Sequence, residues 1–572
     1  MGGRKRVAIV GAGLSGLAAI KSCLEEGMEP VCFEQYDDIG GVWYYTKEYR
    51  EGQGARAFDY LNTNVSREMY GFSDFPYPSN LPPFLNRTMV YDYVQSYCET
   101  FGLRKHIHLR TRIVNIKKAA DYNVTGRWQV ETMDAQKKTK TEIYDFVMIC
   151  SGFYKKPRIP PIEGMETFKG TLEHTYKFRD GLPYKDKNVL VIGNSHSSGD
   201  VSVESSCYAK QVYYSVGDGM LLLPLCVRNG QPWDIAVFRR SKMWNPTKFF
   251  KLLVDTCNER LDHNKAGIAP STPPSRTRVM LNDRVQYKIM NGRIKVVSRL
   301  IRLGPHEAEF DDGTVLKNLD AVLFATGYDF SVDFMDEPFQ GKDRKLGLYK
   351  MMFPLHQHHT LSVVGCVDSD GSIPALAELQ GRFVALVYTG KLRLPSLKVM
   401  TEVTEKMNAD IFEKYGRYKY LVSKTPGKCT TNPLSYRTTL FLIQSMHDFL
   451  SIQRKHLRQI PNLPYRDDIA KQMGVAPSLF DLIKAGPRLA YQYYYGPAFP
   501  YHHRLWGPHS WSGAREAIDN ATEHGHYGKQ MRHVQGPDIP ATNRFLRFII
   551  VSAMIAMLAL AYQKRECFWL SG

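Results

Sequence analysis

Residues 7–34 read VAIVGAGLSGLAAIKSCLEEGMEPVCFE. The stretch contains an apolar strand, a glycine-rich turn, a helix, a second strand and a closing acid, Glu34. In such a unit Gly11 lets the chain turn sharply, Gly13 leaves room for a pyrophosphate, and Gly16 lets the helix pack closely on the sheet. Phosphates are expected at the helix N-terminus, where unpaired N–H groups point at them. The order of these parts predicts a dinucleotide-binding domain of the Rossmann type.

The closing acid discriminates between dinucleotides. Glu34 follows Gly16 by eighteen residues, where a carboxylate accepts hydrogen bonds from ribose hydroxyls. It would repel a 2′-phosphate, so we expect FAD or NAD here rather than NADP. The alternative is a glycine-rich turn without a ligand. The residues of the turn predicted to contact the cofactor are Gly11, Ala12, Gly13, Leu14, Ser15 and Gly16.

A second unit of the same kind lies in the middle of the chain. Residues 188–193 (NVLVIG) are typical of a buried strand, and residues 194–200 (NSHSSGD) lead into a helical pattern. Further strands are expected over 211–215 and 321–324. The sequence therefore predicts an α/β fold with two nested Rossmann-like domains, the second inserted into the first.

Five short motifs narrow the family. They are DDIGGVW at 37–43, LNTN at 61–64, FKGTLEHTYKF at 168–178, ATGY at 325–328 and WGP at 506–508. Together they make the chain resemble the flavin-containing monooxygenases in their membrane-anchored animal form. The resemblance runs from residue 5 to the hydrophobic C-terminus.

The resemblance implies FAD at the first site and NADPH at the second. FAD contacts are implied for Glu34, Gly41, Val42, Trp43, Thr63, Asn64, Val65 and Gln380. NADPH contacts are implied for Gly193, Ser195, Ser197, Ser198, Gly199 and Asp200. For Trp43 taken alone, packing in the core is the alternative.

The implied chemistry is oxygen transfer. NADPH reduces FAD, the reduced flavin captures O₂ as a C4a-hydroperoxide, and nucleophilic nitrogen or sulfur of a small lipophilic substrate, such as a xenobiotic, takes one oxygen atom. Asn64 is the implied catalytic residue, facing the flavin and the retained nicotinamide, because a carboxamide donates and accepts hydrogen bonds without an ionisable proton. An asparagine that caps a turn is the alternative. His174 is expected to fix the connection between the two domains rather than to catalyse.

The second site departs from the family at three positions. Its second and third glycines are replaced by Ser195 and Ser198, which bring a Cβ toward the pyrophosphate and the packing face of the helix. Asp218 follows the next strand where the family usually places an arginine for the 2′-phosphate. We expect NADPH, with NADH left open. The candidates for the missing charge are Lys210, Arg228, Arg239 and Arg240.

Two other functions stay open from the sequence. A Baeyer–Villiger oxygenase uses the same fold to attack a ketone carbonyl, and no motif distinguishes the two reactions. The departures at Ser195, Ser198 and Asp218 also allow an uncoupled NADPH oxidase or a non-catalytic flavin-binding membrane protein.

Cysteine spacing and charge exclude other classes. The ten cysteines form no CxxC or CxxxxC pair, which argues against a metal site and against a redox disulfide. The net charge of +18 comes from scattered basic residues without a nucleic-acid motif. We expect solvated surface charge with a preference for NADPH and anionic lipid, and no nucleic-acid partner. The oligomeric state, including a homo-oligomer, is left open.

The C-terminus carries the membrane signal. Residues 548–562 (FIIVSAMIAMLALAY) are uncharged and apolar, with basic residues on both sides. The run is shorter than the roughly 17–25 residues of a usual spanning helix, so a shallow span or an in-plane anchor is expected. A buried core helix is the alternative. The resemblance implies the endoplasmic reticulum membrane with a cytosolic catalytic body.

The expected organisation has seven parts. The FAD domain comprises 1–155 and 330–445, and the NADPH domain comprises 156–215 and 296–329. An insertion at 216–295 is expected to cover the active site. A helical extension at 446–543 leads to the hydrophobic membrane anchor at 544–572.

Overall fold

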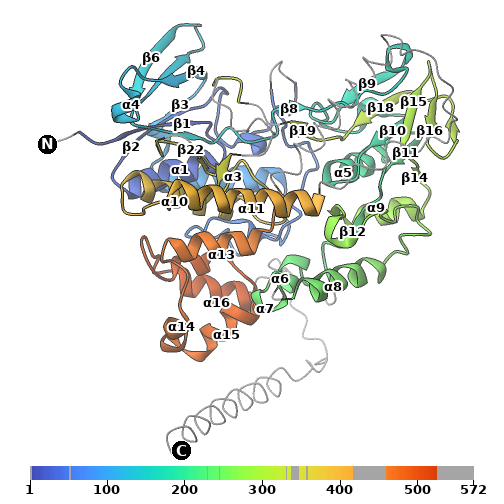
Figure 1. Cartoon of the computed structure of the whole chain (residues 1–572). Helices are drawn as coiled ribbons and strands as arrows, with labels where there is room; N and C mark the ends of the chain where they lie inside the picture. Colours follow the sequence, from blue (N-terminus) through green and yellow to red (C-terminus); the bar gives the residue numbers. More distant parts are fainter. Residues whose placement is uncertain are drawn as a thin grey trace, which may run out of the picture. The chain divides into compact units, whose positions relative to one another are not determined.

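The computed structural model describes residues 3–49, 53–227, 230–243, 245–329, 332–335, 347–355, 358–415 and 459–524. All of them belong to the first of two compact units into which the chain divides, residues 1–528. Within this unit the chain forms two parallel sheets with helices against them (Figure 1). The predicted mixed α/β fold with parallel sheets is therefore confirmed.

The first sheet has the strand order β22-β7-β1-β2-β3. Its strands are β1 (Arg6–Val10), β2 (Glu29–Phe33), β3 (Ile107–His108), β7 (Phe146–Ile149) and β22 (Leu361–Val363). One face is covered by helices α1 (Leu14–Glu25), α3 (Arg87–Thr100) and α10 (Ile373–Tyr388). The other face is covered by the antiparallel strands β4 (Arg112–Lys118), β5 (Trp128–Met133) and β6 (Thr139–Tyr144).

Burial on both faces explains the apolar run of β1. Val7 and Ile9 pack into the core formed with α1, α3 and α10. Ala8 and Val10 pack into the separate core under β4–β6. A strand enclosed in this way reads as continuously apolar rather than alternating.

The second sheet repeats this plan with the order β14-β11-β10-β18-β9. Its strands are β9 (Thr171–His174), β10 (Asn188–Ile192), β11 (Gln211–Ser215), β14 (Ile294–Val297) and β18 (Ala321–Phe324). Helices α5 (His196–Ser205) and α9 (Asp283–Met290) pack on one face. The strands β15 (Leu300–Leu303), β16 (Ala308–Phe310) and β17 (Val315–Leu316) pack on the other.

The two sheets are nested in the sequence. β22 comes after the whole second sheet, yet it pairs with β7 of the first, with Leu361 beside Val147. The short strands β8 (Lys156–Pro157) and β19 (Tyr328–Asp329) pair where the chain enters and leaves the second sheet. His174 is buried there, and its Nε2 lies 3.0 Å from the carbonyl oxygen of Gly327, in keeping with the connecting role expected for it.

Between β11 and β14 the chain adds further elements. They are β12 (Leu221–Leu223), α6 (Trp233–Val237), α7 (Arg240–Met243), α8 (Pro246–Asn258) and β13 (Val279–Leu281). α9 follows them and packs on α5 and β14, so the end of the segment predicted as an insertion contributes to the second sheet.

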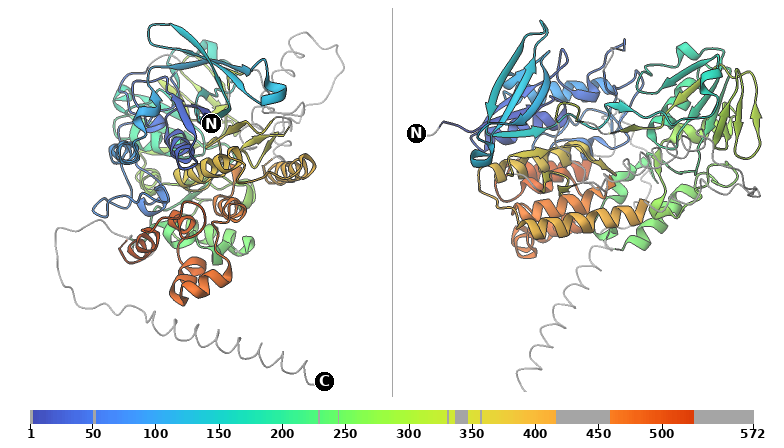
Figure 2. Two further views of the ribbon diagram at one scale, coloured as in Figure 1. Left: turned by 90° about the vertical axis from the view of Figure 1, so that its left-hand side faces the viewer. Right: turned by 45° about the horizontal axis from the view of Figure 1, so that its top comes forward.

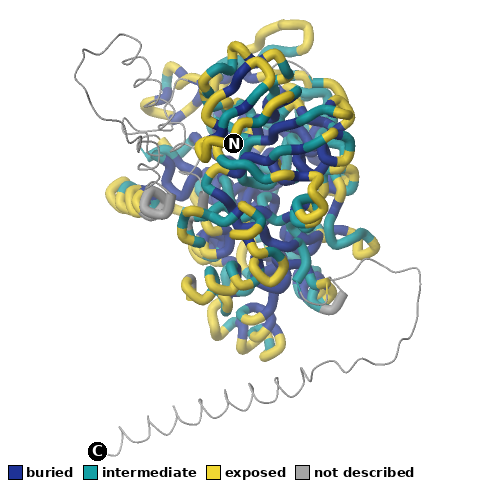
Figure 3. The backbone as a smooth tube through the Cα atoms, turned by 90° about the vertical axis from the view of Figure 1, so that its right-hand side faces the viewer, coloured by how far each residue is buried: buried dark blue, intermediate teal, exposed yellow. Residues whose placement is uncertain are grey.

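Further helices follow β22. They are α11 (Leu397–Tyr415), α13 (Asn462–Gln472), α14 (Leu479–Ala485), α15 (Pro487–Tyr495) and α16 (Ala514–His524). Figure 2 shows α13–α16 gathered together in orange and red, where α13 contacts α10 and α15 contacts α7. Exposed residues follow the outer loops and buried ones the interior (Figure 3). Of the described helices, none is both long and apolar enough to cross a membrane. The predicted anchor at 544–572 lies outside the described residues.

Candidate functional site

A large cavity lies where the two glycine turns approach each other. Its volume is about 1430 Å³, compared with roughly 300–1,000 Å³ for ordinary ligand sites. The turn after β1, residues 40–43 and 61–65, the turn after β10 and the segment from β12 to α9 all contribute to its wall. The cavity therefore has room for more than one ligand.

The first turn forms a cradle that only glycine allows. Gly11 has φ +94°, in the left-handed region that other residues rarely adopt. A Cβ on Gly16 would lie 1.9 Å from the carbonyl oxygen of Gly11, and one on Gly41 would lie 3.0 Å from the Cα of Gly13. Backbone here approaches backbone, and Gly11, Gly13 and Gly41 line the cavity. This shape fits the close approach of a pyrophosphate.

Glu34 lies at the end of β2 on the cavity wall. Its carboxylate accepts hydrogen bonds from the backbone N–H of Ala12 at 2.8 Å and of Tyr36 at 3.0 Å. Burial raises the pKa of this carboxyl, against the hydrogen bonds and Arg56, which favour the charged form. Glu34, which was predicted to bind a ribose, therefore also fixes the glycine turn through its hydrogen bond with Ala12.

The segment with Asn64 is fixed on both sides. The backbone of Thr63 donates to the carbonyl of Leu85 at 2.8 Å, and Thr63 Oγ1 accepts from the N–H of Leu85 at 3.0 Å. Asp234 of α6 accepts from the backbone N–H of Ser66 at 2.6 Å and from its hydroxyl at 2.9 Å. Burial raises the pKa of Asp234 to about 6. Asp234 was not predicted, because a partner 168 residues away leaves no local signal.

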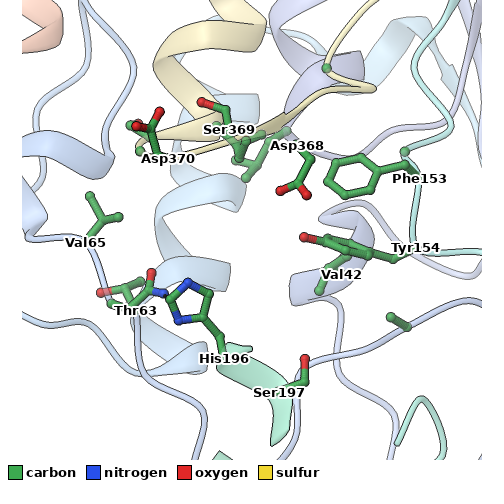
Figure 4. Close-up of a pocket in the computed structure, with 18 of the residues that line it drawn as sticks. Val42, Thr63, Val65, Phe153, Tyr154, His196, Ser197, Asp368, Ser369 and Asp370 are labelled. Atoms are coloured by element: carbon green, nitrogen blue, oxygen red, sulfur yellow. Dashed lines mark hydrogen bonds between the residues drawn. The ribbon is translucent and has the colours of Figure 1, made fainter. Parts of the chain in front are cut away.

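His196 is a second residue that the sequence reasoning missed. It is the first residue of α5, and Figure 4 shows its ring pointing into the cavity between Thr63 and Val65 on one side and Tyr154 on the other. Its Nδ1 lies 3.1 Å from Nδ2 of Asn64. The available signal was its place directly after Ser195 in the second nucleotide turn.

The two serines of the second turn have different positions. Ser195 lines the cavity, whereas Ser198 lies on α5 and is fully buried. Ser198 Oγ accepts from the backbone N–H of Ser195 at 3.0 Å and lies 2.8 Å from the hydroxyl of Tyr214 on β11. The hydroxyl at the position of the third glycine thus has hydrogen-bond partners both in the turn and in the sheet. Gly199 faces Met280, whose Sδ would lie 2.2 Å from a Cβ placed there.

The charge of Asp218 is paired. Arg299, which follows β14, forms an ion pair with Asp218. Of the cations predicted to supply positive charge, Arg239 donates to the carbonyl of Tyr495 and Arg240 pairs with Asp467 at 2.7 Å. Lys210 precedes β11, at the end of the strand opposite the turn, and Arg228 lies outside the described residues. Arg299 is the cation that the structure places beside Asp218.

Most of the predicted site residues line the same cavity. Those that line it are Gly11, Gly13, Leu14, Ser15, Glu34, Gly41, Val42, Trp43, Thr63, Asn64, Val65, Ser195, Ser197 and Asp200. Those that do not are Ala12, Gly16, Gly193, Ser198, Gly199 and Gln380. Gln380 is fully buried one layer behind, where its Oε1 accepts from the N–H of Gly365 at 2.8 Å and its Nε2 donates to Tyr465 at 2.7 Å.

Buried polar atoms on the wall lack partners within the described part of the chain. They include Ser151 Oγ, Arg56 Nη2 and Arg278 Nη2. Buried donors of this kind are normally satisfied by a ligand, water or protein. The residues that carry these atoms line the cavity, and guanidinium and hydroxyl groups suit the phosphates and ribose of a dinucleotide.

The part of the cavity wall formed by α6–α8 is largely apolar. Its side chains come from α6, α7 and α8 and the residues between them, and they include Trp233, Phe238, Met243, Phe249, Phe250 and Leu253. Aromatic and aliphatic groups thus gather on this part of the wall. Such a wall accepts an apolar ligand.

The chain is similar to a known protein family over most of its length. The family model described as flavin-binding monooxygenase-like matches residues 4–426 and 443–563. Flavin-containing monooxygenase 3 of Rattus norvegicus is 33% identical over 564 residues, covering 97% of this chain and 99% of that protein. The N-oxide-forming dimethylaniline monooxygenase 4 of Homo sapiens is 35% identical over 524 residues, covering 90% and 87%.

Solved structures share the fold at lower identity. S-allyl-L-cysteine S-oxygenase from Allium sativum is similar with a TM-score of 0.59 and 21% identity, covering 91% of this chain and 99% of that one. An open crystal structure of cyclohexanone monooxygenase is similar with a TM-score of 0.52 and 15% identity, covering 72% and 93%.

Proposed function

Because the chain belongs to the flavin-binding monooxygenase-like family, we propose that it transfers one oxygen atom from O₂ to nucleophilic nitrogen or sulfur of small lipophilic compounds. The protein is a flavin monooxygenase, and this family uses FAD and NADPH. Reduced flavin supplies the electrons that activate O₂. The protein therefore has to bind and orient the cofactors and the substrate, and to exclude water.

The first glycine turn is the proposed FAD site. Gly11, Gly13 and Gly41 leave room for the pyrophosphate, and Glu34 offers its remaining lone pairs to the ribose. The second turn, at the N-terminus of α5, is the proposed NADPH site. Asn64 lies on the cavity wall beside α5, where it can bind both cofactors.

The observation that carries the proposal is the shared cavity. Both turns line one space of about 1430 Å³, and apolar side chains of α6–α8 line it as well. Exclusion of water protects a reactive oxygen donor from wasteful decay. The same apolar wall favours lipophilic over charged substrates.

The membrane attachment is part of the proposal. Residues 544–572 contain the apolar run 548–562 with basic residues around it, and the named relatives are animal proteins. We propose that this segment binds the lipid of the endoplasmic reticulum membrane and that the catalytic body faces the cytosol.

The proposal is tested by product analysis. Full-length, FAD-loaded protein is incubated with NADPH and ¹⁸O₂, and separately with N,N-dimethylaniline, methyl phenyl sulfide and cyclohexanone. We expect one ¹⁸O atom in the N-oxide and in the sulfoxide. A lactone as the main product would show Baeyer–Villiger oxygenation, and consumption of NADPH with only hydrogen peroxide formed would show an uncoupled oxidase. Either result overturns the proposal.

A further inference from the structure

His196 connects three segments that are distant in sequence. It starts α5, and its Nδ1 faces both the amide nitrogen of Asn64 at 3.1 Å and the backbone nitrogen of Leu281 at 3.4 Å. Asn64 precedes α5 by 132 residues, and Leu281 ends β13. The imidazole therefore lies where the second nucleotide turn, the segment that carries Asn64 and strand β13 meet.

The contacts determine the tautomer of the ring. A backbone N–H can only donate, so Nδ1 must accept from Leu281. Burial lowers the pKa of His196 to about 4, which keeps the ring neutral at physiological pH. In a neutral ring with an unprotonated Nδ1, the proton is on Nε2.

The tautomer then determines the orientation of the Asn64 amide. Since Nδ1 accepts, the group of Asn64 that faces it is the NH₂ group, and Oδ1 points elsewhere. Without this constraint an asparagine amide could present either end. Within the described residues, neither Asn64 Oδ1 nor His196 Nε2 has a hydrogen-bond partner, and both residues line the cavity.

From this geometry we infer that His196 is a positioning residue, which holds the Asn64 amide with its oxygen toward the cavity and offers its own Nε2–H to the nicotinamide dinucleotide bound at the N-terminus of α5. The inference rests on the proposed function for the identity of the ligands. It adds a residue that acts on Asn64 from the second nucleotide turn, so the binding of one dinucleotide is linked to the orientation of a group beside the other.

Two variants separate the two roles. His196→Asn keeps an acceptor near the position of Nδ1 and removes the Nε2 donor, whereas His196→Ala removes both. His306→Ala is the control, because His306 is exposed and is not among the residues that line the cavity. FAD content and far-UV circular dichroism establish that each variant is folded.

The first measurement is the Kd of NADP⁺ for the oxidised, FAD-loaded protein. Binding is monitored by the change in the flavin absorbance. Loss of one hydrogen bond of about 0.5–1.5 kcal/mol corresponds to roughly a 2- to 12-fold weaker Kd. We expect this weakening in both His196 variants and not in His306→Ala. An unchanged Kd in both would overturn the donor role.

The second measurement is hydrogen peroxide formed per NADPH consumed in the presence of methyl phenyl sulfide. We expect more peroxide with His196→Ala, a ratio close to that of the unmodified protein with His196→Asn, and no additional effect of His196→Ala in an Asn64→Ala background, because the two residues act as a unit. Equal uncoupling by Ala and Asn, or additive effects, would overturn the positioning role. Absence of oxygenated product from the unmodified protein would instead refute the proposed function, and the NADP⁺ titration would still test His196.

Discussion

At the scale of single residues, Asp200 carries a charge that depends on pH near neutrality. It lies one turn after His196 on α5, lines the cavity, and accepts a hydrogen bond from Asn282 at 2.8 Å. Burial raises the pKa of Asp200 to about 7, although Arg284 and Asn282 favour the charged form. The side chain is therefore neutral below about pH 7 and negative above it. Because its pKa is raised in the folded protein, the folded state binds this proton more tightly than the unfolded state does. The bound proton therefore stabilises the fold at acidic pH, and this contribution is lost as the pH rises from about 4 through 7.

This titration predicts a pH dependence of cofactor binding. As Asp200 becomes negative, it repels the anionic dinucleotide at α5, so we expect the Kd of NADP⁺ to rise by roughly threefold between pH 6 and 8 at low salt. Asp200→Asn should lack this rise. The 2′-phosphate of NADP⁺ titrates near pH 6 whichever protein binds it. The difference between the two pH profiles of the Kd therefore reports on the Asp200 carboxyl alone. A parallel pH profile for the two proteins would contradict the prediction.

At the scale of elements, the strands were predictable and the contacts between segments were not. The apolar runs 188–193, 211–215 and 321–324 correspond to β10, β11 and β18, because strands buried on both faces need apolar residues throughout. Asp234 and His196 escaped prediction, since their partners Ser66 and Asn64 are 168 and 132 residues away. Hydrogen bonds between distant segments leave no periodicity in the sequence.

The junction of β1 and α1 gives a sharp test. A Cβ on Gly16 would lie 1.9 Å from the carbonyl oxygen of Gly11, and backbone cannot rotate away as a side chain can. Gly16→Ala should therefore displace the start of α1 and open the pyrophosphate cradle. We expect the ratio of flavin to protein absorbance after purification to fall by more than half. Gly3→Ala is the control, because nothing lies within 4 Å of that position. Full flavin retention in Gly16→Ala would refute the role of this contact.

At the scale of the whole described unit, a buried ion cluster joins the C-terminal helices to the first sheet domain. Arg504, which follows α15, lies 2.7 Å from Glu378 of α10 and 2.8 Å from Asp74. Lys21 of α1 also pairs with Asp74 at 2.7 Å. Burial alone would raise the pKa of Glu378, but Arg504, Arg382 and Lys21 lower it to about 2. The opposite charges of the cluster thus offset the free-energy cost of burying each charged group in the interior.

Removal of the central cation should destabilise this assembly. Arg504→Met leaves Glu378 and Asp74 buried without their main partner, and breaking such a pair costs about 3–5 kcal/mol. We expect the midpoint of urea unfolding, monitored by flavin fluorescence, to be lower than in the unmodified protein. Arg515→Met removes only a half-exposed pair with Asp519 and should cost less than about 1 kcal/mol. Because the loss arises from unpaired charge, Arg504→Met combined with Glu378→Gln should recover part of the stability. Equal midpoints for Arg504→Met and Arg515→Met would show that the cluster does not hold the C-terminal helices in place.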